Sequence, residues 1–319
     1  MIGQCSIAVI GAGAVGSYYG ARLAEAGHDV RFLMRRDYRA VHDSGLKVIS
    51  PDGDLVLDNP SIAQSSKDIG HVDWVLCALK TTSIEDAQEL VRPCVTVGTR
   101  ILVLMNGLGI EERFAEWFGS QCIFGGMAFT CINRGEPGYV HHLAHGPITI
   151  AHLQNDPVEL EIGRTLWEGS KVKVSSSPSL RRARWEKLCW NIPFSGLCVA
   201  AGGVTTDRIA SDAGLRGTAL SLMEEVIAAG NTDLKSHFES TRLEHNAVVD
   251  YMFHLTDTMG AYRPSLLLDF IERRPMEVEA MFGEPLRRAQ SYGLDMPYLR
   301  LLTVLLRALD AQQQENCHP

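Results

Sequence analysis

A glycine-rich loop directly after a short apolar run constrains the fold of this chain more than any other stretch. Residues 7–10 are Ile-Ala-Val-Ile, and the loop that follows is Gly11-Ala12-Gly13-Ala14-Val15-Gly16. It matches the pattern Gly-x-Gly-x-x-Gly, in which the glycines allow a tight turn, a close approach to a pyrophosphate, and packing of the next helix on its strand. The free amides at the start of that helix would hold the pyrophosphate.

The residues around the loop support this interpretation. Residues 17–26 have the pattern of an amphipathic helix, Gly27 stands where a helix C-cap is favoured, and residues 29–34 return as a second strand. The three elements complete a βαβ unit of about thirty residues. The alternative is a glycine-rich turn that binds nothing; such a turn would not require a strand before it and a helix and strand after it.

Composition restricts the class of protein. The chain has 319 residues, 45% hydrophobic and 21% charged, enough for two domains with buried cores. A net charge of -8 argues against a nucleic-acid partner, which would need clustered cations. No leader pattern and no uninterrupted apolar window of about 18 residues is present, so we expect a cytoplasmic protein without a membrane partner. The eight cysteines form no Cys-x-x-Cys pair and are expected to be reduced.

The order of apolar runs predicts a doubly wound sheet in the first half of the chain. Apolar runs at 72–79 and 101–105 read as buried strands, and a helix is expected at 84–91 between them. From residue 122 the alternation of strands and helices gives way to consecutive predicted strands at 122–132, 139–143 and 148–152. These strands predict antiparallel additions to the parallel sheet.

Beyond Pro178 the apolar periodicity becomes helical. Helices are expected at 185–192, 215–229, 243–259, 266–271 and 298–309. The run Ser175-Ser176-Ser177-Pro178 is the best linker candidate. We therefore predict an α/β chain with an N-terminal NADP-binding Rossmann domain (1–177) and an all-helical substrate domain (178–319). An amphipathic helical domain is compatible with a monomer and with a homodimer, so the sequence predicts no single oligomeric state.

The end of the second strand carries information about the cofactor. NAD-binding units normally place Asp or Glu there for the ribose 2′-hydroxyl, whereas NADP-binding units place Arg there for the 2′-phosphate. This strand ends in Met34-Arg35-Arg36, with Asp37 next. Arg35 therefore favours NADPH; the alternative is that both arginines merely face solvent. Gly11, Arg35, Lys80 and Asn106 all follow predicted strands and should converge at one edge of the sheet.

A polar stripe marks the first helix of the second half. Lys187, Asn191 and Ser195 are spaced four apart, which places them on one face of an α-helix. A buried lysine can act as an acid or base near neutral pH. The alternative is a lysine that reaches solvent from an amphipathic helix. Pro193 would kink the helix and could move Ser195 off the stripe.

Several pieces in a fixed order carry a resemblance to a known family. They are the Gly11–Gly16 loop, Arg35, Ala78-Leu79-Lys80, Met105-Asn106-Gly107-Leu108-Gly109, Trp185-Glu186-Lys187-Leu188 with Asn191, and Ser265 with Glu277. Together they resemble the ketopantoate reductases (2-dehydropantoate 2-reductases) over nearly the whole chain. The resemblance implies a Rossmann domain, a helical domain, NADPH, and reduction of a 2-oxo acid to a 2-hydroxy acid.

The resemblance also implies roles for single residues. Lys187 is similar to the general acid that protonates the ketone oxygen, and Glu277 to the carboxylate that orients the lysine; the alternative for Glu277 is a surface helix residue. Asn106 matches an asparagine near the nicotinamide end, and Lys80 a lysine on the cofactor side. An ammonium beside the ketone would stabilise the charge that hydride addition builds on its oxygen.

The substrate end matches the family less closely. Asn191 and Ser265 resemble ligands of the substrate hydroxyl and carboxylate. Ser195 stands where many members have a second asparagine, and residues 200–207 replace a stretch that usually contains asparagine. These departures put ketopantoate itself in question, but not an oxo acid.

We therefore predict an NADPH-dependent oxidoreductase that converts a 2-oxo acid to a 2-hydroxy acid, namely ketopantoate to pantoate in pantothenate biosynthesis. Alternatives are a reductase of another branched oxo acid, a β-hydroxyacid or opine-type dehydrogenase, and a non-catalytic NADP sensor. No metal site is expected, because strand alternation separates His141 from His142 and no Cys or carboxylate is close to them or to His145.

Overall fold

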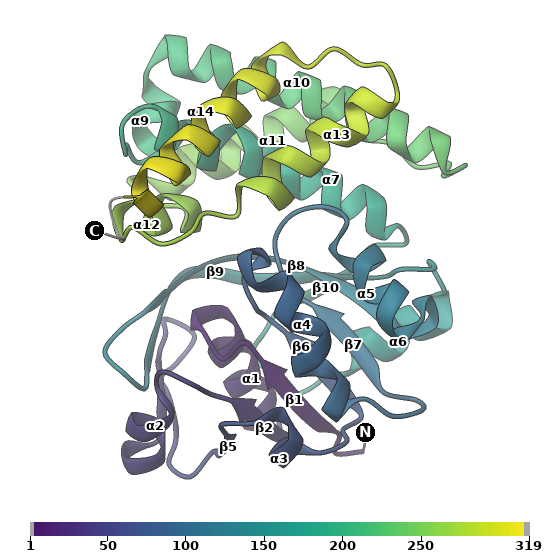
Figure 1. The fold of residues 1–319 in the computed structure, drawn as a ribbon, viewed down its shortest axis with the longest axis vertical. Helices are drawn as coiled ribbons and strands as arrows, with labels where there is room; N and C mark the ends of the chain where they lie inside the picture. The colour runs from purple at the N-terminus through teal and green to yellow at the C-terminus, as the bar shows by residue number, and fades with distance from the viewer. Residues whose placement is uncertain (1–2, 316–319) are drawn as a thin grey trace. The chain divides into compact units, whose positions relative to one another are not determined.

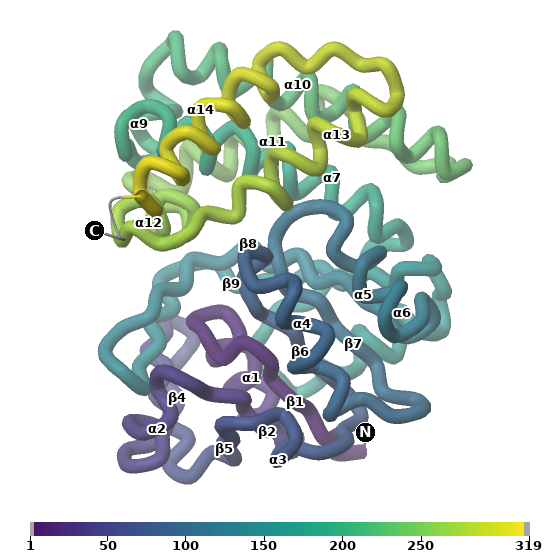
Figure 2. The backbone as a smooth tube through the Cα atoms, in the orientation of Figure 1, coloured from purple at the N-terminus to yellow at the C-terminus, as the bar shows by residue number. Residues whose placement is uncertain are grey.

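The computed structural model describes residues 3–315, and their contacts divide the chain into two compact units. Unit 1 comprises the described residues up to Met105 together with Ile110–Leu180. Unit 2 comprises Asn106–Gly109 and the described residues from Arg181 onward. The chain can be followed through each unit in Figures 1 and 2. A four-residue segment from the N-terminal half of the sequence therefore belongs to the unit formed by the C-terminal part.

Unit 1 is built on a ten-stranded sheet with a parallel half. Six neighbouring strands lie in the order β8-β7-β6-β1-β2-β5, all parallel to one another. They are β1 (Ser6–Ile10), β2 (Asp29–Leu33), β5 (Ser61–Ala63), β6 (Trp74–Cys77), β7 (Arg100–Val103) and β8 (Ile123–Arg134). This is the order expected of a doubly wound dinucleotide-binding sheet.

The other strands extend the sheet beyond β8. Strand β9 (Tyr139–His152) pairs antiparallel with β8 and parallel with β3 (Leu46–Ile49) and β10 (Val174–Ser176), and β4 (Leu55–Leu57) pairs antiparallel with β3. The prediction of two strands at 139–143 and 148–152 is wrong, because β9 is continuous. Its register against β8 shifts near His145 and Gly146, whose φ angles are 62° and 115°. A bulge therefore absorbs the extra residues that a turn was expected to hold.

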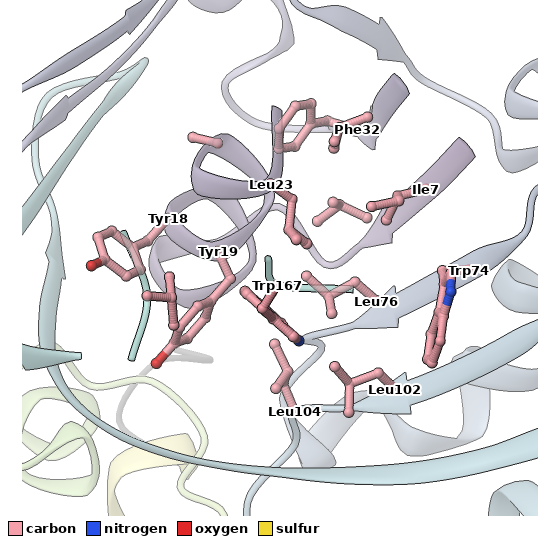
Figure 3. Packing of buried hydrophobic residues seen from close by; sticks show 14 of the residues in the cluster. Ile7, Tyr18, Tyr19, Leu23, Phe32, Trp74, Leu76, Leu102, Leu104 and Trp167 are labelled. Atoms are coloured by element: carbon pink, nitrogen blue, oxygen red, sulfur yellow. The ribbon is translucent and has the colours of Figure 1, made fainter. Parts of the chain in front are cut away.

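Helices cover both faces of the sheet in unit 1. They are α1 (Ala14–Glu25), α2 (Tyr38–Ser44), α3 (Ser66–Ile69), α4 (Ile84–Val91), α5 (Ile110–Phe118) and α6 (Pro157–Thr165). Ile7 and Val9 of β1 pack with Tyr19 of α1 in the core shown in Figure 3, while Ala8 and Ile10 point to the opposite face and are equally buried. Burial on both faces explains why these strands are apolar throughout.

Every regular element of unit 2 within the described residues is helical. The α-helices are α7 (Leu180–Trp190), α8 (Gly196–Ala200), α9 (Thr206–Ser211), α10 (Ala213–Ser236), α11 (His245–Met259), α12 (Ser265–Ile271), α13 (Glu284–Ser291) and α14 (Pro297–Glu315). Two π-helical segments, η4 (Asn191–Ser195) and η5 (Glu279–Gly283), lie between them. The predicted fold class is confirmed: a Rossmann sheet with antiparallel additions, followed by helices. No helix within residues 3–315 is long and apolar enough to cross a bilayer.

Candidate active site

The glycine-rich loop has the geometry that a pyrophosphate requires. Gly11 has a φ of 93°, and a Cβ atom there would lie 2.6 Å from the Leu79 amide nitrogen, so the tight turn needs glycine. Gly13 is the N-cap of α1, and a Cβ atom on it would meet nothing within 4 Å. The first turn of α1 holds no acidic residue and no side-chain cap. Its amides and dipole are therefore available to an anion, and the loop fits a dinucleotide.

Two basic residues lie at the same edge of the sheet as this loop. Strands β1, β2 and β6 are parallel neighbours, so their carboxyl ends share one edge, and Gly11, Arg35 and Lys80 follow those ends. Arg35 and Arg36 are exposed, and neither side chain hydrogen-bonds or ion-pairs with another residue in the described range 3–315. Their guanidinium groups can therefore meet a phosphate without breaking an existing contact.

The segment Asn106–Gly109 is anchored to η5 in unit 2. The Leu108 amide donates to the Ala280 carbonyl oxygen at 3.0 Å. Gly107 has a φ of 101°, and a Cβ atom there would come within 2.6 Å of the Ala280 oxygen. Glycine at 107 therefore lets the loop press directly on the π-helical backbone. This close approach fixes the position from which the Asn106 side chain extends.

Asn106 joins two buried charged residues of unit 2. Lys187 Nζ donates to Asn106 Oδ1 at 2.9 Å, and Asn106 Nδ2 donates to Glu277 Oε2 at 3.3 Å. The amide orientation follows from chemistry, since an ammonium only donates and a carboxylate only accepts. Lys187 is 6% exposed and Glu277 is 4% exposed. Glu277 is therefore not a surface residue, and it lies outside the helices, two residues before η5 begins.

The expected polar stripe is interrupted. Helix α7 ends at Trp190, and the π-helical segment η4 carries Asn191 and Ser195. Pro193 has no N–H for the bond to residue 189, and its ring would clash with that carbonyl, so a wider turn replaces the α-helix here. The three residues therefore do not lie on one continuous α-helix, and the disruption expected at Pro193 takes the form of a π-helical turn.

The predicted substrate residues are polar groups that make no side-chain hydrogen bond within residues 3–315. Asn191 and Ser195 are 7% and 3% exposed, and neither side chain hydrogen-bonds to another residue in the part of the chain that the structure describes. Ser265 is exposed at the start of α12, and α12 packs against η4 and α8. Buried polar groups are ordinarily paired, so an unpaired amide and hydroxyl beside the lysine helix suit a polar ligand.

The contacts of His142 in β9 show a structural role for this histidine. His142 is buried; its Nδ1 lies 2.8 Å from Ser50 Oγ and its Nε2 lies 2.9 Å from the His145 carbonyl oxygen. The carbonyl only accepts, so Nε2 carries the proton and Ser50 donates to Nδ1. Burial lowers the pKa of His142, which keeps it neutral. Among residues 3–315 no three His, Cys, Asp or Glu side chains gather as a metal site.

The sequence did not predict two groups of ionic contacts. Arg134 Nη2 lies 2.6 Å from Asp37 Oδ2 in unit 1, and Asp233 collects several donors in unit 2. The paired residues are far apart in the sequence, and no periodicity links them. Local sequence patterns therefore could not predict these pairs.

Taken together, a dinucleotide-binding Rossmann unit and a helical unit with a buried lysine, amide and carboxylate define a class of two-unit nucleotide-dependent oxidoreductases. Comparison with known proteins narrows the class. Residues 7–155 match the family described as "Ketopantoate reductase PanE/ApbA", and residues 179–310 match "Ketopantoate reductase PanE/ApbA C terminal". The chain belongs to the ketopantoate reductase family and is an oxidoreductase.

Individual relatives are similar to this chain over nearly its full length. The chain is 35% identical to the 2-dehydropantoate 2-reductase of Nostoc sp. over 316 residues, covering 96% of each chain. It is 42% identical to the 2-dehydropantoate 2-reductase structure from Geobacter metallireducens, with a TM-score of 0.91 and coverage of 95% and 99%. A D-mandelate dehydrogenase structure with NADH is 20% identical, with a TM-score of 0.86 and coverage of 97% and 99%, and shows the shared fold alone.

Proposed function

We propose that this protein uses NADPH to reduce a 2-oxo acid to a 2-hydroxy acid, with 2-dehydropantoate converted to pantoate in pantothenate biosynthesis. The observation that carries the proposal is the buried chain of hydrogen bonds from Lys187 through Asn106 to Glu277. In this proposal unit 1 binds the dinucleotide and unit 2 holds the acid and the substrate. The relatives named 2-dehydropantoate 2-reductase support the choice of substrate.

The proposed mechanism assigns one step to each residue of the network. When bound, NADPH supplies the hydride that adds to the ketone carbon. The Lys187 ammonium stabilises the negative charge that develops on the ketone oxygen and then gives it a proton. Asn106 accepts one N–H of that ammonium and so orients it. Glu277 fixes the amide so that its oxygen stays turned toward the lysine.

Substrate recognition is assigned to groups near the lysine helix. Asn191 would bind the hydroxyl end, Ser195 lies one π-turn further, and Ser265 would bind the carboxylate. The first two side chains are buried without an internal hydrogen bond, so a polar ligand would satisfy them. A serine reaches less far than the asparagine that many relatives carry at 195. We therefore expect turnover of branched oxo acids without a hydroxyl as well, at a lower rate than turnover of ketopantoate.

Turnover of a panel of 2-oxo acids tests this function. We expect NADPH oxidation with ketopantoate, and slower oxidation with branched oxo acids that lack its hydroxyl, because a polar partner is then missing. The assay follows NADPH absorbance with each acid at equal concentration. Binding of NADPH without turnover of any acid would support a cofactor sensor and refute the proposed reaction.

Arg35→Ala tests the cofactor assignment. Because a charged hydrogen bond to the 2′-phosphate would be lost, the KM for NADPH should rise about tenfold or more, while the KM for NADH stays the same. Arg164→Ala on α6 is a matched control, since Arg164 pairs with Glu161 on the same helix. Steady-state kinetics with both cofactors measure the change. An unchanged ratio of the two KM values would refute the phosphate role of Arg35.

A further inference from the structure

Asp37 stands at the N-terminus of α2, where its carboxylate could cap the helix. It is the N-cap residue of α2, and its carbonyl accepts the Val41 amide. Asp is among the best N-cap residues because its side chain accepts an amide of the first turn. Here the side chain makes no such bond. The carboxylate of Asp37 is therefore held by something else.

Arg134, the last residue of β8, holds it. Its Nε and Nη2 lie 2.9 Å and 2.6 Å from Asp37 Oδ2. The Asp37 side chain is 11% exposed, and its Oδ1 is buried without a hydrogen-bond partner. Within residues 3–315 no other side chain pairs with this carboxylate. The Asp37 carboxylate therefore pairs with Arg134 although it does not cap α2 and its second oxygen accepts no hydrogen bond from the described residues.

The neighbours of Asp37 give this pair a consequence for the cofactor. Arg35 is two residues away and Arg36 is adjacent; both are exposed, and neither side chain has a hydrogen-bond or ion-pair partner among the described residues. A carboxylate at the end of the second strand has two effects in dinucleotide-binding units. It accepts the ribose 2′-hydroxyl of NAD and repels the 2′-phosphate of NADP. A released Asp37 could also pair with Arg35 and cancel its charge.

We propose that Arg134 is a positioning residue for cofactor choice. It holds the Asp37 carboxylate in an ion pair, so that Asp37 does not pair with Arg35 or Arg36 and their positive charges remain available to a 2′-phosphate. This inference rests on the proposed use of NADPH. Arg134 acts through Asp37, and the preference for NADPH arises from a pair that joins β8 to the N-terminus of α2. The sequence near Arg35 alone does not set that preference.

Arg134→Gln tests the proposal in the full-length enzyme. We expect the ratio of kcat/KM for NADPH to kcat/KM for NADH to fall about tenfold, through a higher KM for NADPH and an equal or lower KM for NADH. The double variant Arg134→Gln with Asp37→Asn should return the ratio close to the wild-type value, because the released carboxylate is gone. Arg100→Gln, which breaks a comparable pair with Glu159 at the amino end of β7, should leave the ratio unchanged.

Each other outcome overturns the inference. An equal loss with both cofactors would mean that Arg134 only supports the fold. A ratio that falls but is not restored by Asp37→Asn would mean that Arg134 binds the phosphate directly. A wild-type enzyme that prefers NADH would refute the NADPH proposal itself, whereas an NADPH preference that survives Arg134→Gln refutes the role of Arg134 alone.

Discussion

Replacing Lys187 with alanine should lower kcat for oxo-acid reduction by about 10³-fold or more, because the variant loses both the proton donor and the charge that stabilises the developing alkoxide. The Kd for NADPH should stay nearly unchanged, since the glycine loop and Arg35 lie in the other unit. Steady-state turnover gives kcat, and NADPH fluorescence titration gives Kd. The two measurements together separate loss of chemistry from loss of cofactor.

Three further variants make the Lys187 result decisive. Lys187→Met keeps most of the buried volume and should lose as much kcat as alanine does. Lys187→Arg keeps the charge but gives up its proton with difficulty, so it should recover only part of the rate. Lys235→Ala removes an exposed lysine of α10 and should leave kcat unchanged. Near-normal turnover by a folded Lys187→Ala or Lys187→Met variant would refute the acid role.

The sequence predicts the parts of the fold that depend on neighbouring residues. The βαβ unit around Gly11–Gly16 and the parallel strands were predictable because turn chemistry and apolar runs are local signals. The continuous strand β9 was not, because a bulge and a turn share the residues His-Gly-Pro at 145–147. The π-helical turn at Pro193 was expected only as a kink. In each case residue types alone do not distinguish the backbone geometry that the structure shows from the one that was expected.

The candidate site depends on contacts between distant residues. Asn106 lies 81 positions from Lys187 and 171 from Glu277, and no periodicity relates them. Only the resemblance to ketopantoate reductases placed these residues in one site, and it assigned Asn106 to the cofactor side. The hydrogen bonds of Asn106 to Lys187 and Glu277 depend on the packing of Gly107 directly on Ala280, and the cofactor-side role of Asn106 stays a prediction. Close backbone packing of this kind is a tertiary property.

Asp233→Ala should lower the free energy of unfolding of the helical unit by about 3–5 kcal/mol, because buried donors lose their acceptor and two arginines lose a buried carboxylate partner. Asp233 is fully buried. Its Oδ2 accepts from Trp185 Nε1 at 2.7 Å and Arg181 Nη1 at 3.1 Å, and its Oδ1 accepts from the Tyr292 hydroxyl at 2.6 Å. Arg288 Nη1 lies 3.5 Å from Oδ2. The cluster therefore joins α7, α10 and α13.

Urea unfolding of the wild type and the variant measures this loss, and Asp257→Ala is the matched control. Asp257 pairs with Arg216 in the same unit, but both side chains are partly exposed, so its removal should cost less than about 1 kcal/mol. Equal costs for the two variants would refute a special role for the buried cluster.

The pH dependence of the Asp233→Ala effect follows from the same contacts. Burial alone would raise the pKa of Asp233, but the hydrogen bonds from Trp185 and Tyr292 and the nearby arginines outweigh it and hold the pKa below its usual value. Stabilisation by a carboxylate with a lowered folded-state pKa is complete above the unfolded pKa of about 3.9 and is lost as the pH falls through the folded-state pKa. The cost of Asp233→Ala should therefore be constant from about pH 5 to 8 and should shrink only below about pH 4. A cost that fell steadily between pH 8 and 5 would show that another group titrates in the cluster.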